Sequence, residues 1–232
     1  MKYTALLLLT GLICSTTLFG QYRKTVLVKA GDDVAQAYSP NGFYRFPQFT
    51  EASLYNVKRQ GQSSMKFNYN LFTDRMQFIN NEGDTMDMMN PLRFDSMVID
   101  RTIFFYKSET GFLELIGTAW PIRLLSKTDI KLKTESIGAY GGSNSTSSVD
   151  RMKTVMVGTT MYNFKSNENI TIKQAVDWYW MGEDGHIMKA TRRNLNTLLS
   201  PEKAHIANDF IKQNNIKFDR EADLIKLLVA LR

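Results

Sequence analysis

The spacing of apolar residues between positions 65 and 89 is the feature that most constrains the fold of this chain. A strand with one apolar face carries apolar side chains at every second position. Four residues follow that pattern: Met65, Phe67, Tyr69 and Leu71. A turn at Thr73-Asp74 then leads to a strand over 75–79, and a turn at 81–83 leads to a strand over 85–89. Segments this close leave no room for helices between them, so neighbouring strands are expected to be antiparallel.

Similar strands are expected further along the chain. They cover 98–106, 112–120 and 122–133. The glycine- and serine-rich segment over 138–149 is expected to be a loop between two strands, because strand-like alternation resumes beyond it at Val155. A last hairpin is predicted over 177–188.

The chain changes character after position 190, where three short amphipathic helices are predicted. Their expected N-caps are Thr191, Ser200 and Asp219, and Pro201 in the first turn supports the second start. The residues expected to face the sheet are Leu195, Leu198, Leu199, Ile206, Phe210, Ile211, Leu224, Leu227, Leu228 and Leu231. Strands followed by helices predict an α+β fold. We expect an antiparallel β-meander, as an open sheet, sandwich or partial barrel, followed by three short C-terminal helices.

The first 20 residues have the composition of a secretory signal peptide. Lys2 precedes an apolar run that ends at Phe19, and the small residue Gly20 stands before Gln21. The run is shorter than the roughly 20 residues of a membrane-spanning helix, and no later segment replaces it. We therefore expect cleavage at Gln21 and an exported protein, in the periplasm or associated with the outer membrane or the cell exterior.

Three parts follow from these patterns. They are a signal peptide over 1–20, a β-rich domain over 21–190 and a helical tail over 191–232 that packs on the sheet. The lone cysteine, Cys14, lies in the predicted signal peptide, and Ile13 before it disfavours lipidation. The exported chain is therefore expected to have no disulfide and to be stabilised by packing.

The charge of the chain excludes one class of partner. The formal net charge is +6, and it falls to +5 when the predicted signal peptide takes one lysine away. The basic residues are scattered among acidic ones and form no basic stripe, so no nucleic-acid partner is expected.

Several short segments together resemble a family of small secreted proteins from Bacteroidota. They are Phe49-Thr50, Phe67-Asn68-Tyr69-Asn70, Met76-Gln77-Phe78-Ile79-Asn80, Gly83-Asp84-Thr85 and Gly138-Ala139-Tyr140-Gly141. The capped, leucine-rich tail is part of the same resemblance. It implies an exported protein of the cell envelope and brings no catalytic residue with it.

No motif in the sequence predicts catalysis, a metal or a cofactor. His186 and His205 have no histidine or cysteine partner at ligand spacing, and the chain has no Gly-x-Ser-x-Gly elbow or Walker loop. Acidic pairs such as Asp84 with Asp87 would serve a glycosidase only if they faced each other across a cleft. Carboxylates in turns are normally solvated, which is the interpretation we favour here.

Aromatic residues give the candidate ligand-binding positions. Trp178 and Trp180 share one face of a predicted strand, where exposed rings would form a carbohydrate platform. The favoured alternative is that both rings pack under the C-terminal helices. Tyr140 lies in the glycine- and serine-rich segment, which is either a partner-binding loop or a flexible connection.

Two three-residue segments predict covalent modification. Asp84-Thr85-Met86 and Asp95-Ser96-Met97 resemble the site at which Bacteroidota attach O-linked glycans to exported proteins. Thr85 and Ser96 are the predicted acceptors. An ordinary turn and strand end are the alternative at both positions.

These observations favour a secreted, envelope-associated, non-catalytic binding or structural protein, with an envelope protein or a glycan as partner. The alternative is an envelope hydrolase that acts on glycan or peptide. A hydrolase would show a concave pocket with opposed carboxylates, whereas a binding module would show an exposed aromatic or apolar patch.

Overall fold

The computed structural model of the chain describes residues 24–56, 59–137, 143–144 and 168–232. The predicted signal peptide, Tyr140, Val155 and most of the segment over 138–149 lie outside these residues. The described strands are β1 (Thr25–Val28), β2 (Thr50–Asn56), β3 (Arg59–Asn70), β4 (Arg75–Ile79), β5 (Thr85–Asp87), β6 (Ser96–Ile99), β7 (Thr102–Lys107), β8 (Gly111–Ala119), β9 (Ile122–Ile137), β10 (Ser143–Asn144), β11 (Asn169–Met181) and β12 (Ile187–Lys189).

The strands form one open, antiparallel sheet. Its order is β1-β11-β9-β8-β7-β6-β2-β3-β4-β5, with β10 paired to β9 and β12 paired to β11. Two runs of consecutive strands, β2 to β5 and β6 to β9, join where β2 pairs with β6. The antiparallel meander expected from the sequence is therefore confirmed, with an open sheet as its form.

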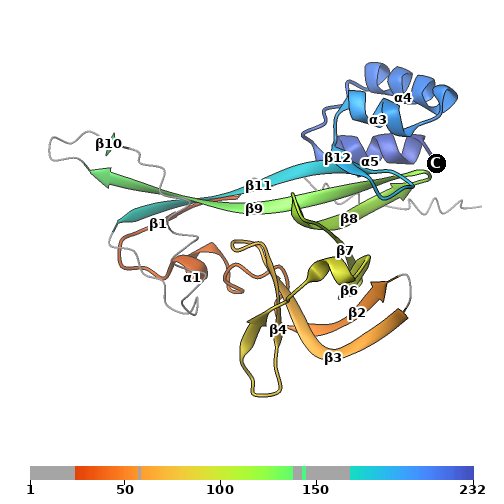
Figure 1. Cartoon of the computed structure of the whole chain (residues 1–232). Helices are drawn as coiled ribbons and strands as arrows, with labels where there is room; N and C mark the ends of the chain where they lie inside the picture. Colours follow the sequence, from red (N-terminus) through yellow and green to blue (C-terminus); the bar gives the residue numbers. More distant parts are fainter. Residues whose placement is uncertain (1–23, 57–58, 138–142, 145–167) are drawn as a thin grey trace, which may run out of the picture.

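Helices occur within the strand region as well as after it. The described helices are α1 (Val34–Tyr38), the 3-10 helix η1 (Pro91–Arg93), α3 (Arg192–Leu198), α4 (Pro201–Gln213) and α5 (Glu221–Ala230). The α+β class is confirmed, but the expectation that the helices are only the three C-terminal ones is wrong, because α1 and η1 lie between strands. Figure 1 shows α3, α4 and α5 at one end of the long β9–β11 hairpin and α1 near its other end. None of the described helices is long and apolar enough to span a membrane.

The strand predicted over 98–106 is in fact the hairpin β6–β7. Its turn residues, Asp100 and Arg101, both lie in the left-handed region, with φ of 44° and 66°. A two-residue hairpin turn of this hand usually contains glycine or asparagine. The absence of those residues here is why the sequence pattern indicated one continuous strand.

Two polar side chains of β3, Asn68 and Asn70, are buried. The Asn68 amide donates to the Phe46 carbonyl and accepts from the Phe46 backbone N–H. Asn70 accepts from the backbone N–H groups of Phe72 and Thr73. The segment that leads into β2 therefore covers this side of β3, and the two amides satisfy backbone groups that would otherwise be buried without partners.

Two of the three N-caps predicted for the helical tail are confirmed. Thr191 and Ser200 accept hydrogen bonds from the backbone N–H groups of Asn194 and Lys203, as expected of N-caps. Asp219 is not the cap of α5, because Arg220 occupies that position. Ile206, predicted to face the sheet, is 54% exposed. The four leucines at helical spacing in and just after α5 are buried as predicted: Leu224, Leu227, Leu228 and Leu231.

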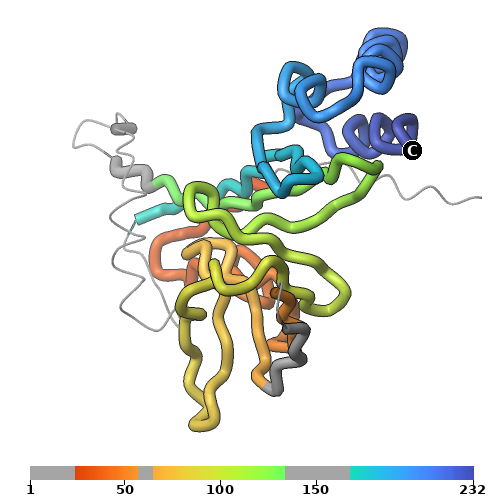
Figure 2. Tube along the Cα trace, turned by 45° about the vertical axis from the view of Figure 1, so that its right-hand side comes forward, coloured from red at the N-terminus to blue at the C-terminus, as the bar shows by residue number. Residues whose placement is uncertain are grey.

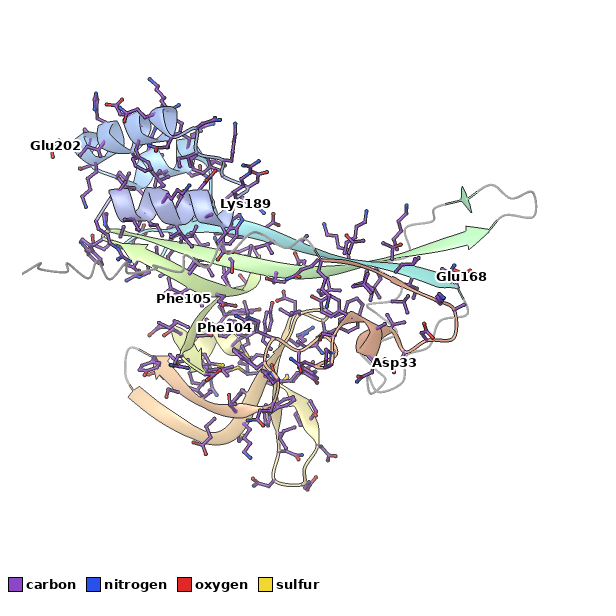
Figure 3. The ribbon with its side chains drawn as sticks, turned by 180° about the vertical axis from the view of Figure 1, so that it is seen from behind. Asp33, Phe104, Phe105, Glu168, Lys189 and Glu202 are labelled. Atoms are coloured by element: carbon purple, nitrogen blue, oxygen red, sulfur yellow. The ribbon has the colours of Figure 1, made fainter. Side chains whose placement is uncertain are left out.

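Figure 2 shows that the tail and the β2–β5 strands extend from opposite sides of the long hairpin. In Figure 3, side chains fill the space between that hairpin and the strands below it, with Phe104 of β7 among them. Phe104 is fully buried, and Phe105 next to it packs on the other side of the sheet against the cluster of Leu113, Leu125 and Tyr179.

Candidate functional site: a pocket between two apolar clusters

One face of the β9–β11 hairpin changes from apolar to polar and back along its length. The β9 residues on this face are Ile122, Leu124, Ser126, Thr128, Ile130 and Leu132. The β11 residues on the same face are Trp180, Trp178, Val176, Gln174, Ile172 and Ile170. Ser126 is paired with Trp178, Thr128 with Val176 and Ile130 with Gln174. The polar residues of both strands therefore meet at the centre of the face.

Different parts of the chain cover the two apolar ends. The helical tail packs on Ile122, Leu124 and Trp180. It approaches β8 closely at Gly117, where a Cβ would lie 3.1 Å from Leu228 Cδ1. Helix α1 and the neighbouring aromatic residues pack on the other end, around Ile130 and Ile172. Between the two clusters lies a pocket of about 440 Å³, which we call the central pocket.

The floor of the central pocket is formed by the sheet. Ser126, Thr128, Gln174, Val176 and Trp178 line it from β9 and β11. When polar side chains lie in the middle of a covered face of a sheet, they decrease the stability of the fold unless they are hydrogen-bonded. Their position therefore suits contact with a molecule in the pocket.

One wall is formed by the residue before β1 and by the segment between β1 and β2. Lys24 lines it from the first position, and Tyr38, Ser39 and Tyr44 line it from the second. The Lys24 ammonium donates to the Tyr38 carbonyl and lies 4.4 Å from the centre of the Tyr38 ring. The Tyr44 hydroxyl donates to Gln77 Oε1 at 2.8 Å. These contacts fix the two tyrosine rings at the pocket.

Arg45 and Glu114 connect this wall to the sheet. Arg45 Nη2 lies 2.8 Å from Glu114 Oε1, and Arg45 Nε lies 2.9 Å from Glu114 Oε2. Two parallel hydrogen bonds of this kind are the strong, bidentate form of an arginine–carboxylate pair. The hydrogen bond to Glu114 raises the pKa of Arg45, against the opposing effect of burial. Within the pair, the guanidinium and the carboxylate neutralise each other.

Glu221 lines the central pocket from the first turn of α5. Burial raises the pKa of its carboxyl group, and the negative charge of Glu114 raises it further. Within the part of the chain that the structure describes, no cation lies within ion-pair distance of Glu221. Its carboxylate is therefore available to a molecule in the pocket.

The two tryptophans predicted as a ligand platform are both buried. Trp180 lies under the helices, and its indole N–H donates to the Thr191 carbonyl at 3.3 Å. Trp178 is 6% exposed and lines the central pocket, and its indole N–H has no hydrogen-bond partner among the described residues. Of the predicted ligand-binding residues, Trp178 thus reaches the pocket, Trp180 belongs to the core and Tyr140 lies outside the described chain.

The other predicted positions lie away from the pocket. Thr85 is exposed at the start of the edge strand β5, and Ser96 is half-buried in β6 opposite Tyr55. His186 and His205 are exposed on separate elements, and His205 Nδ1 lies 3.2 Å from Asp209. The described residues contain no group of three or more histidine, cysteine or acidic side chains placed to hold a metal ion.

The charged walls of the pocket leave no pattern in the sequence. Lys24, Arg45, Glu114 and Glu221 come from four separate segments and follow no common spacing. The floor did carry a signal. In the strand predicted over 122–133, the apolar alternation is interrupted at Ser126 and Thr128, which marks a polar site on an otherwise apolar face.

Comparison of the chain with protein-family models, with curated proteins and with solved structures found no match. The resemblance to secreted Bacteroidota proteins therefore stays a prediction from the sequence. The geometry of the central pocket is what indicates a function.

Proposed function

We propose that this chain is an exported, envelope-associated, non-catalytic binding protein whose ligand occupies the central pocket. The observation that supports this function most is the polar floor between two apolar clusters. Apolar side chains at Ser126, Thr128 and Gln174 would let the two clusters merge and would stabilise the fold. The pocket volume of about 440 Å³ also lies within the range of roughly 300–1,000 Å³ that is usual for small-molecule sites.

The predicted export is compatible with this pocket. Cleavage at Gln21 would leave Lys24 in the mature chain, so the wall that Lys24 lines would be retained. An exported binding protein with no cysteine would depend on packing for its stability, and the two apolar clusters supply that packing.

One observation favours the hydrolase as a second candidate. Glu114 and Glu221 both line the central pocket, and a raised pKa such as that of Glu221 is what a general acid requires. However, Arg45 already holds both oxygens of Glu114. A carboxylate bound in this way is a weak nucleophile or base, which is why we favour binding over catalysis.

Recovery of a small molecule from the native source tests the proposal. The purified protein is incubated with the small-molecule fraction of the cell envelope, washed and denatured, and the released compounds are identified by mass spectrometry. The matched control is Thr128→Phe, which fills the floor of the pocket and leaves its walls unchanged. We expect a compound that the wild-type protein retains and the Thr128→Phe variant does not.

Equal recovery from both proteins, or none from either, would contradict the proposed binding function. Circular dichroism of the variant shows whether it keeps its fold. Incubation of the recovered compound with wild-type protein and with Glu221→Gln then separates the two candidates. A hydrolase would convert the compound and lose that activity in Glu221→Gln, whereas a binding protein returns the compound unchanged.

A further inference from the structure

We infer that the central pocket binds a neutral, hydroxyl-rich ligand of the saccharide class. This inference rests on the proposed function, and it names the chemistry of the ligand. Three properties of the lining carry it: balanced charge, hydrogen-bonding groups of both kinds and aromatic rings.

The charges of the lining are balanced. Lys24 and Arg45 supply two positive charges, and Glu114 and Glu221 supply two negative ones. The Arg45–Glu114 pair is neutral as a unit. A site that selects a strongly charged ligand concentrates the opposite charge. The central pocket does not, so phosphate-bearing ligands would meet two carboxylates, and polycationic ligands would meet Lys24 and Arg45.

The pocket contains both hydrogen-bond donors and hydrogen-bond acceptors, so a ligand that satisfies them must itself carry both kinds of group. An ionised Glu221 only accepts, whereas the indole N–H of Trp178 only donates. The Trp178 indole N–H has no hydrogen-bond partner among the described residues. The hydroxyls of Ser126 and Thr128 do both. A ligand hydroxyl also donates and accepts, so a ring that carries several of them can satisfy all these groups at once.

The aromatic rings match the apolar part of the same ligand class. Tyr38, Tyr44 and Trp178 line the pocket together with Leu71 and Val176. The C–H faces of a sugar ring pack on such side chains, whereas its edge carries the hydroxyls. A purely apolar ligand would leave the polar floor without partners, at a cost in binding energy. The mixed lining therefore favours a molecule that is itself apolar on its faces and polar on its edge.

Calorimetric titration with defined sugars tests this inference. The neutral probes are N-acetylglucosamine, galactose and mannose, and the charged comparisons are glucosamine and galacturonate. The full-length mature protein is titrated with each at the same pH. We expect saturable binding of at least one neutral sugar and markedly weaker binding of the charged ones.

Three variants locate the bound sugar. Glu221→Gln removes the charge of one wall, and Trp178→Phe keeps an aromatic ring but removes the indole N–H. Each is expected to weaken binding on the order of tenfold, because Trp178→Phe removes a hydrogen bond and Glu221→Gln removes the charge that strengthens one. The matched control is Glu202→Gln on α4, whose exposed side chain points outward from the helical tail (Figure 3) and does not line the pocket. It should bind like the wild-type protein.

The outcomes separate the ligand class from the proposed function. Binding of only charged sugars would overturn the inference that the ligand is neutral. If none of the sugars binds while a compound of another class is recovered in the Thr128→Phe comparison, the saccharide class is wrong and the binding function stands. If the sugars bind equally to wild-type protein and to both pocket variants, the site lies elsewhere and the inference fails. A loss of binding in Trp178→Phe with unchanged thermal stability supports it.

Discussion

The carboxylate of Asp74 occupies the space that a side chain at Gly111 would fill. A Cβ at Gly111 would lie 2.1 Å from Asp74 Oδ2 and 2.6 Å from Lys127 Nζ. The Asp74–Lys127 ion pair, with its atoms 2.5 Å apart, therefore lies directly against the backbone where β8 begins. Lys127 is itself buried, so the fold depends on keeping this partner in place.

Substitution of Gly111 by alanine should destabilise the protein strongly. Its φ of +78° alone costs about 1 to 3 kcal/mol for a residue with a side chain, and displacement of Asp74 adds the cost of an unpaired buried lysine. The matched control is Gly83→Ala, because Gly83 has a φ of +89° but no atom within 4 Å of its Cβ position. Chemical denaturation should show a larger loss for Gly111→Ala. Equal losses would mean that the ion pair moves without cost.

The stability of the fold should fall at high pH through Tyr69. Burial raises the pKa of its hydroxyl, with further contributions from the charge of Asp74 and from the hydrogen bond to it. A group whose pKa is higher in the folded state stabilises the fold below its unfolded pKa of about 10, and this contribution is lost as the pH rises further. Above that pH, the free energy of unfolding obtained from denaturation curves should therefore fall more steeply with pH for the wild-type protein than for Tyr69→Phe. Parallel curves would contradict this role.

The packing of the helical tail on the sheet should depend on Leu227. Its side chain is 0% exposed, so Leu227→Ala should lower the free energy of unfolding by roughly 2 to 5 kcal/mol. The control is Val229→Ala on the same helix, because Val229 is 59% exposed. Thermal unfolding measures both. An unchanged midpoint for Leu227→Ala would show that the tail does not contribute to the stability of the sheet.

Export should remove the first 20 residues. Mass spectrometry of protein from its native source is expected to find an N-terminus at or near Gln21, since Gly20 provides the small residue before the cleavage point. An intact Met1 in the cell envelope would contradict cleavage. A lipid on Cys14 would replace the prediction with an anchored protein.

The predicted O-glycosylation can be tested at Thr85, because its side chain is exposed. Thr85 is exposed on an edge strand of three residues, whereas Ser96 is half-buried between other strands. Intact-mass measurement of native protein should show a mass above that of the bare chain, and Thr85→Ala should remove the excess. Ser96→Ala is the comparison and should retain it. A native mass equal to the bare polypeptide would rule the modification out.

Local chemistry made much of this fold predictable. Strand β4 occupies the predicted range over 75–79, and the caps of α3 and α4 are the predicted Thr191 and Ser200. These features depend on side chains within a few residues of one another. Where local chemistry is unusual, the prediction fails, as at the turn of Asp100 and Arg101 and at the cap of α5.

The central pocket depends on contacts that are distant in the sequence. Arg45 reaches Glu114 across 69 positions, and Glu221 joins them from the end of the chain. No periodicity relates such residues, so their meeting could not be predicted. The burial of Trp180 was predictable, by contrast, because a helical tail with many leucines requires an apolar surface.

Helix α5 combines an anchor and a pocket wall in one short element. Leu227 and Leu228 fix it to the sheet, while Glu221 faces the pocket from its first turn. A molecule that binds Glu221 and the floor at once therefore bridges helix and sheet, and its binding energy adds to the free energy that keeps the tail docked. Amide hydrogen exchange in α5 would then report whether the pocket is filled, without any label on the ligand.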